Sequence, residues 1–352
     1  PGAGGGGTGL AARNKPGQIM QINEIGEFGL IGRIAERFAP LVPAGWEGIG
    51  DDCAVIPWDE GQSMLITTDL LVEGVHFLRD RISARELGAK SLAVNLSDVA
   101  AMGGRAVGTF LSLGLPVEGV GVEWCDAFFE GYRSFGVPLL GGDTTASTTG
   151  IVINITVLGR AENSRIKRRN TARPGDRIAV TGPLGESAAG LRVLLEGLPS
   201  TPDTDELIRH HHRPRPHLEE GEWLGRERGV HAMMDVSDGV ASDLLHILRG
   251  SAVGATVDLS RIPVSPLLQR TAEQFDGWEA RRLALTGGED YVLLLTVAPE
   301  EADDLERRFE AQFGRPLHWI GTCTAGAPEI VYRDEAAGTT VENTTYRGFN
   351  HF

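Results

Sequence analysis

Strand-like and helix-like segments alternate along this chain, and the alternation starts again after residue 160. In the first series, apolar runs predict strands and the apolar periodicity between them predicts helices: strands at 64–74, 106–116, 137–145 and 150–160, and helices at 84–103 and 122–136. The second series predicts strands at 176–182, 254–263, 318–325 and 329–334, helices at 184–198 and 299–313, and combined segments at 233–248 and 283–297. Two successive α/β halves with mixed sheets, divided near residue 162, are the expected fold.

Length and composition fit this organisation. The 352 residues suggest two domains, and we predict a Gly-rich disordered tail at 1–18, an N-terminal domain at 19–162 and a C-terminal domain at 163–352. An amphipathic helix is expected near the start, because apolar residues recur at helical spacing from Phe28 to Phe38. The net charge of −15 argues against nucleic-acid or membrane-surface binding. Three scattered cysteines and the lack of an apolar run of membrane-spanning length predict a cytoplasmic protein.

Acidic residues recur beside glycines where the predicted strands end. The pattern covers 48–52 (GIGDD), 141–143 (GGD), 235–239 (DVSDG) and 287–290 (GGED), and Asp69 ends a strand after two threonines. Carboxylates in such positions can hold Mg²⁺, which binds one or two carboxylates together with substrate phosphates. Flanking glycines let a phosphate approach the backbone. The alternative for any single cluster is ordinary turn or helix-cap chemistry.

Asp98 carries an argument of its own. It lies in NLSDVAAMG (95–103), within a helix of apolar and small residues. A carboxylate is out of place there unless it is paired or bound to a metal. By contrast, Lys90 in GAKS (88–91) does not complete a phosphate-binding P-loop, because no glycine directly precedes the lysine.

Other polar groups leave two interpretations open. His210, His211 and His212 could bind a metal, but a solvated loop is favoured beside RPRP (213–216). His76 is either a substrate contact or a structural hydrogen-bond partner. The basic run 165–169 is either a solvated linker or a phosphate clamp. TGPLGESAAG (181–190) either offers helix amides to an anion or only packs.

An ordered set of motifs resembles the thiamine-monophosphate kinase family over nearly the whole chain, from about Glu24 to Phe352. Each motif is weak alone, but their order is specific: GEFGLI (26–31), GIGDDCAV (48–55), TTDLLVEGVHF (67–77), NLSDVAAMG (95–103), GGDTT (141–145), DVSDG (235–239), TGGEDY (286–291) and GFNHF (348–352).

The resemblance implies an α/β fold of the α+β type. Its two domains are those of aminoimidazole-ribotide synthetase, and the N-terminal strands pair across a homodimer. It also implies transfer of the ATP γ-phosphate to thiamine monophosphate, which gives thiamine diphosphate, with several Mg²⁺ ions.

The resemblance further implies a role for each matching residue. Magnesium ligands would be Asp52, Thr67, Thr68, Asp69, Asp98, Asp143, Asp235 and Asp238. Contacts to ATP would come from Phe129, Gly142, Asp143, Arg169 and Ser237, with Arg168 as the alternative to Arg169. Contacts to thiamine monophosphate would come from His76, Glu289 and Phe349.

The expected chemistry needs no protein nucleophile. The phosphate of thiamine monophosphate is itself the attacking group, so cations and geometry are the requirement. Direct in-line transfer without a phosphoenzyme is therefore predicted. One rival of another class is a non-catalytic nucleotide or thiamine-phosphate binding protein, but such a protein should have lost some of the acidic positions, and none is missing. The nearer rivals are other enzymes of the fold, namely aminoimidazole-ribotide synthetase, selenophosphate synthetase and the hydrogenase-maturation enzyme. The last of these would end in cysteine, and selenophosphate synthetase would need a reactive cysteine that residues 1–30 lack.

Overall fold

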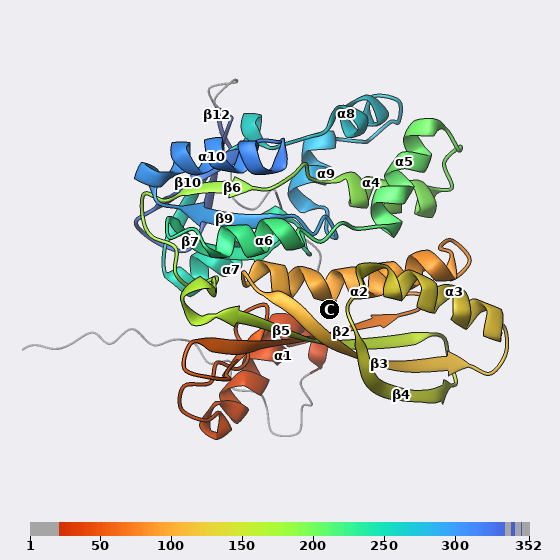
Figure 1. The fold of residues 1–352 in the computed structure, drawn as a ribbon. Helices are drawn as coiled ribbons and strands as arrows, with labels where there is room; N and C mark the ends of the chain where they lie inside the picture. The colour runs from red at the N-terminus through yellow and green to blue at the C-terminus, as the bar shows by residue number, and fades with distance from the viewer. Residues whose placement is uncertain (1–20, 335–338, 342–345, 347–352) are drawn as a thin grey trace, which may run out of the picture. The chain divides into compact units, whose positions relative to one another are not determined.

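The computed structural model describes residues 21–334, 339–341 and 346 (Figure 1). The described residues divide into two compact units, a small one that includes residues 21–40 and a large one that begins at residue 41. In the first unit, helix α1 (Ile22–Phe38) confirms the expected amphipathic segment and is kinked at Gly26, whose φ is 66°. The predicted tail at 1–18 lies outside the described residues.

The second unit begins with a five-stranded mixed sheet. Its strands follow the order β1-β2-β5-β3-β4. Only β3 and β4 run parallel, and the other neighbours are antiparallel. The strand bounds are β1 (Ala54–Pro57), β2 (Gln62–Val72), β3 (Arg105–Pro116), β4 (Leu139–Ser147) and β5 (Val152–Glu162). All except the short β1 were expected from the apolar pattern.

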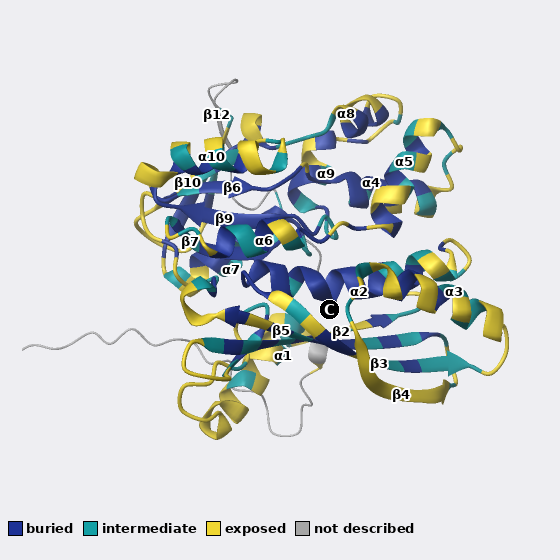
Figure 2. Cartoon of the chain, in the orientation of Figure 1, coloured by how far each residue is buried: buried dark blue, intermediate teal, exposed yellow. Residues whose placement is uncertain are grey.

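Helices α2 (Ala84–Ala101) and α3 (Val122–Tyr132) accompany this sheet. Close packing between them depends on glycine, because a Cβ atom at Gly131 would lie 1.8 Å from the carbonyl oxygen of Arg85. Helix α2 also packs on β2 and β5 on one side and on α6 and β7 on the other. Figure 2 shows it as buried along most of its length. The buried middle of α2 therefore lies at the junction of the two halves.

A seven-stranded mixed sheet follows, in the order β12-β11-β8-β10-β6-β9-β7. Its strands are β6 (Arg177–Val180), β7 (Val230–Asp235), β8 (Gly254–Asp258), β9 (Leu293–Val297), β10 (His318–Thr324), β11 (Ile330–Asp334) and β12 (Thr339–Val341). The helices are α4 (Glu186–Glu196), α5 (Pro202–His212), α6 (Leu218–Gly225), α7 (Val240–Ser251), α8 (Pro266–Ala272), α9 (Ala280–Thr286) and α10 (Pro299–Phe313). The two mixed sheets agree with the predicted fold class.

The core is divided in the same way as the sheets. One buried cluster joins apolar residues of β2, β3 and β5 to α2 and α3. Another lies between the seven-stranded sheet and α7. A third includes Ala100 and Ala101 of α2 together with Met233 and Leu293 of the second sheet. Within the described residues, none of the helices has the length and apolar character needed to span a bilayer.

Candidate metal and phosphate site

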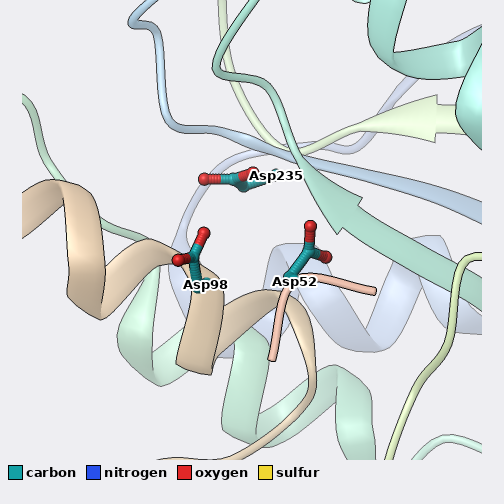
Figure 3. Close-up of side chains that lie close together, drawn as sticks. All are labelled: Asp52, Asp98 and Asp235. Atoms are coloured by element: carbon teal, nitrogen blue, oxygen red, sulfur yellow. The ribbon is translucent and has the colours of Figure 1, made fainter. Parts of the chain in front are cut away.

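Three aspartates from distant parts of the sequence meet where the two sheets adjoin (Figure 3). Asp52 lies in the turn before β1, Asp98 on α2 and Asp235 at the end of β7. Each offers a carboxylate oxygen, and these oxygens lie within 4.8 Å of one another. Three of the acidic positions chosen from sequence for their neighbouring glycines or their apolar helix thus converge in space.

The electrostatics of this cluster favour a cation. Burial raises the pKa of Asp52, Asp98 and Asp235 above the usual range, and neighbouring carboxylates raise those of Asp52 and Asp98 further. Asp52 Oδ2 and Asp235 Oδ2 are buried and have no hydrogen-bond partner among the described residues. Unpaired hard oxygens beside other carboxylates are the donor set that Mg²⁺ takes. The residues present therefore fit the implied metal.

Strand β2 divides its predicted ligands between two faces. Thr67 donates a hydrogen bond to Asp98 Oδ2, and burial and Asp235 raise the pKa of Asp69 to about 6. Thr68 points the other way, as alternation along a strand requires. Its hydroxyl accepts a hydrogen bond from Asn154 Nδ2 at 3.0 Å. Thr67 and Asp69 belong to the aspartate cluster, and the side chain of Thr68 does not.

The basic run is fixed rather than solvated. Arg169 contacts both members of the Asp-Asp pair, with Nε 3.2 Å from Asp51 Oδ1 and Nη2 donating to Asp52 Oδ1. Arg168 instead forms an ion pair with Glu47 at 2.6 Å. Of the two arginines considered for phosphate binding, only Arg169 adjoins the cluster.

The DVSDG loop leads from β7 into α7. The backbone N–H of Asp238 donates to Asp243 Oδ2 at 3.2 Å, and the carbonyl of Ser237 accepts from the N–H of Glu289 at 2.7 Å. Asp243 is 1% exposed, and the sequence analysis did not single it out. The available signal was a carboxylate in the first turn of an apolar helix, as Asp98 is a carboxylate within one.

Glu289 is held by two residues that sequence analysis did not assign to the site. Lys90 Nζ lies 3.0 Å from Glu289 Oε2, and His211 Nδ1 lies 3.1 Å from the same oxygen. Lys90 is 1% exposed. A lysine inside the apolar helix α2 was a signal of the same kind as Asp98.

The expectation of a solvated histidine loop is wrong. Residues 210–212 form the last turn of α5, and His211 and His212 are buried. His217 is buried as well, with Nδ1 2.7 Å from Thr181 Oγ1. Burial lowers the pKa of His217 to about 4. Residues 202–212 have helical periodicity, but two of the buried positions on this helix are histidines and prolines follow it, so the segment looked like a polar loop.

Buried histidine makes the stability of the fold sensitive to acid. The pKa of His217 in the folded protein lies below the ordinary histidine value of 6.5, so the unfolded state binds the proton first as the pH falls. The contribution of neutral His217 to the free energy of unfolding is fully present above pH 6.5. It is lost as the pH falls toward about 4, and the total loss is about 3 kcal/mol. We expect His217→Asn to flatten the dependence of the unfolding free energy on pH in that window.

Urea unfolding from pH 4 to pH 7 measures this effect. The matched control is His210→Asn, because the side chain of His210 is 43% exposed. A His217→Asn variant whose pH slope equals that of wild type would contradict the assignment.

The other predicted site residues within the described chain are not part of the aspartate cluster of Asp52, Asp98 and Asp235. Gly142 and Asp143 are on the edge strand β4, two strands beyond β5 and three beyond β2. Phe129 is 40% exposed on α3. His76 Nδ1 accepts a hydrogen bond from the N–H of Val72 at 3.0 Å, so it has a structural bond. Phe349 lies outside the described residues.

The backbone N–H groups at the glycine turn before α4 are hydrogen-bonded to a carboxylate of the chain itself. Asp290 Oδ2 accepts a hydrogen bond from the N–H of Gly185 at 2.6 Å, and Asp290 Oδ1 accepts one from the N–H of Ser187 at 3.4 Å. Because a carboxylate of the chain itself takes these helix N-terminal amides, the packing interpretation of this segment is favoured over an anion site.

Comparison with known proteins follows the same division of the chain. The family described as AIR synthase related protein matches with its N-terminal domain at residues 50–161 and with its C-terminal domain at residues 173–333. Two hydrogenase-maturation HypE structures match with TM-scores of 0.66 and 0.64 at 19% identity, which is a likeness of fold alone.

Similarity in sequence is greater to one group of enzymes. The thiamine-monophosphate kinase of Salmonella typhimurium is 39% identical over 93% of this chain and 98% of its own length. That of Bacillus subtilis is 34% identical over 87% and 93%. The solved structure of AaThiL in complex with AMPPCP and TMP has a TM-score of 0.81 at 32% identity, covering 95% of this chain and 99% of that one. With two such relatives matched along nearly their whole length, this chain belongs to the thiamine-monophosphate kinase family.

Proposed function

We propose that this protein transfers the γ-phosphate of ATP to thiamine monophosphate, giving ADP and thiamine diphosphate. The observation that carries the proposal is the cluster of Asp52, Asp98 and Asp235, with two buried carboxylate oxygens that lack a partner. The relatives in the same family, and the complex of AaThiL with AMPPCP and TMP, support the choice of substrates.

Magnesium is the cofactor that the cluster would hold. Asp52, Asp98 and Asp235 are the proposed ligands, with Asp69 and Thr67 beside them, and Asp238 is proposed for a further ion. When bound, Mg²⁺ would neutralise charge on the phosphates and help to orient them. The Thr68 side chain is on the other sheet face, so only its backbone remains a candidate ligand.

The chain's own groups would position the two substrates. Arg169 lies beside Asp52 and is proposed to contact the phosphates of ATP. Ser237, two residues after Asp235, is proposed as a further ATP contact. For thiamine monophosphate, Glu289 is the best-supported contact, and His76 and Phe349 remain proposals. Phe129, Gly142 and Asp143 remain proposed ATP contacts. Because they are not part of the aspartate cluster in one chain, we propose that they contact ATP in a site shared with a second subunit.

We infer direct in-line transfer. Oxygen of the thiamine monophosphate phosphate attacks the γ-phosphorus while the bond to the β,γ-bridging oxygen breaks, and ADP leaves with that electron pair. The attacking phosphate is already deprotonated near neutral pH, so no side chain has to remove a proton.

The decisive assay measures ADP and thiamine diphosphate formed from ATP and thiamine monophosphate, with free thiamine as the control acceptor. Equal amounts of the two products from the monophosphate, and none from thiamine, are expected. With γ-labelled ATP, all label should appear in product. Label retained on the protein would overturn direct transfer, and absence of product from folded protein would overturn the function.

We also propose that the five-stranded sheet pairs across a homodimer. Strand β4 bonds only to β3 in the described sheet, and its residues are exposed almost throughout, including Leu139 at 48%. A long exposed edge strand is a template for pairing with another chain. Such pairing would let Asp143 serve a site formed with a second subunit.

Light scattering should therefore give a mass twice the 37.7 kDa of the chain. We expect Leu139→Lys, which places a charge on the β4 edge, to shift the protein toward monomer. Leu195→Lys is the control, because Leu195 is 65% exposed on α4. A stable wild-type monomer would refute the dimer.

The proposal also includes a domain boundary and a cellular location. The division into an N-terminal domain ending near residue 162 and a C-terminal domain from residue 163 is supported by the break between the two sheets. The three cysteines are free thiols, which supports a reducing cytoplasmic location.

A further inference from the structure

A buried network stands behind Glu289 and joins the two halves of the larger unit. Lys90 comes from α2, against the five-stranded sheet, whereas His211 comes from α5 and Glu289 from the loop between α9 and β9. Lys90 Nζ lies 3.0 Å from Glu289 Oε2 and 3.4 Å from His211 Nε2. His211 Nδ1 lies 3.1 Å from Glu289 Oε2.

The protonation states of this network follow from its contacts. Lysine can only donate, so the His211 nitrogen that faces it, Nε2, is the acceptor and the ring proton is on Nδ1. Burial and the Lys90 charge lower the pKa of His211, which keeps the ring neutral. Lys90 and Glu289 then form a compensated ion pair, and Lys90 and His211 together lower the pKa of Glu289 to about 2 against the effect of its burial.

Glu289 is also held through its backbone. Its φ of 63° is unusual for a residue with a side chain, and its N–H donates to Ser237 O at 2.7 Å. A non-glycine residue in that conformation is retained only where its surroundings determine it, and such positions cluster at functional sites. The backbone therefore ties Glu289 to the DVSDG loop that carries Asp235.

Only one oxygen of the carboxylate is used by the network. Both Lys90 and His211 contact Oε2, and none of the residues at 21–334 donates a hydrogen bond to Oε1. The Glu289 side chain is 27% exposed, in contrast to Lys90 and His211 behind it. An ionised carboxylate oxygen accepts hydrogen bonds and attracts positive charge, but it repels phosphate.

We propose that Lys90 and His211 are positioning residues that fix Glu289 so that Oε1 accepts a hydrogen bond from an amino group on a cationic heterocycle. The inference rests on the proposed function and refines it. Thiamine monophosphate has an amino group on its pyrimidine and a positive charge on its thiazolium, whereas its phosphate must face the aspartate cluster. The network would thus determine which end of the substrate enters each part of the site.

Steady-state kinetics of Lys90→Met, His211→Leu and Glu289→Gln test this role. Because a hydrogen bond to a charged group contributes about 1.5–3 kcal/mol, we expect KM for thiamine monophosphate to rise by about 10- to 150-fold. The KM for ATP should stay within about twofold. In the Glu289→Gln background, Lys90→Met should raise this KM little further, because Lys90 acts on the substrate only through the Glu289 carboxylate.

Two further variants separate positioning from folding. His211→Asn retains a donor near the position of Nδ1 and should restore most of the affinity that His211→Leu loses. Lys167→Met removes another buried lysine, which donates to the carbonyls of Glu227 and Val230. It should lower thermal stability without the selective rise in KM for thiamine monophosphate.

The outcomes distinguish the two proposals. Wild-type protein that makes no thiamine diphosphate overturns the proposed function itself. Active wild type, with KM for both substrates changed equally in His211→Leu or Lys90→Met, overturns the positioning role. If Lys90→Met does not fold, the comparison of His211→Leu with His211→Asn decides. An analogue of thiamine monophosphate without the amino group tests the contact itself. If wild type and Glu289→Gln bind the analogue equally, the amino contact is supported. If wild type binds the analogue more tightly than Glu289→Gln by the same factor as for thiamine monophosphate, Oε1 faces the thiazolium charge and the amino contact is overturned.

Discussion

Replacing Asp98 with asparagine is expected to lower phosphate transfer by more than about 100-fold and to leave the metal-free protein at least as stable as wild type. Changes to groups that only support a metal ligand already cost about 10- to 100-fold, and Asp98 is a proposed ligand itself. Asparagine keeps the shape and can still accept the hydrogen bond from Thr67. It removes the Asp98 carboxylate from a group that repels it, since the neighbouring carboxylates raise the pKa of Asp98.

Turnover at saturating substrates and the melting temperature without Mg²⁺ measure the two effects. Asp126→Asn is the matched control, since Asp126 is an exposed aspartate on helix α3 and both measurements should stay at wild-type values. A strained site commonly trades stability for activity, so a rise in melting temperature together with lost transfer is the expected signature. Activity close to wild type in Asp98→Asn would remove the residue from the metal site.

Removing Mg²⁺ with a chelator is expected to stop product formation and to lower the melting temperature of the wild-type protein. The folded site gathers carboxylates that the unfolded chain separates, so a cation that binds only the folded state stabilises it. At a free concentration 100 times Kd, the stabilisation is about 2.7 kcal/mol. Restoring Mg²⁺ should recover both properties.

Thermal melts over a range of MgCl₂ concentrations provide the measurement, with KCl at equal ionic strength to correct for screening. Asp98→Asn should respond to MgCl₂ less than wild type does, because it has one ligand fewer. An equal rise in melting temperature with KCl and MgCl₂ would argue against a specific magnesium site. So would full activity in the presence of the chelator.

Local sequence pattern was sufficient for most of the fold. Period-two and period-3.6 apolar spacing identified β2, α2, β3 and β5 within a few residues of their observed ends. Helices α5 and α6 were not predicted, because histidines, prolines and short length obscured their buried faces. The acidic positions were recognisable as well, since Asp98 stood in an apolar helix and the others stood beside glycines.

Which of those acidic residues share a site depended on the tertiary structure. The sequence implied both Thr67 and Thr68 as ligands, and the structure puts their side chains on opposite faces of β2. The sequence also could not tell that Asp52, Asp98 and Asp235 would meet while Asp143 stayed on an edge strand. The pairing of Lys90 with Glu289, 199 residues apart, was equally hidden. Periodicity determines the direction of a side chain relative to its own element. The partner it meets is determined by the strand order and by how α2 packs between the two sheets, which no local pattern encodes.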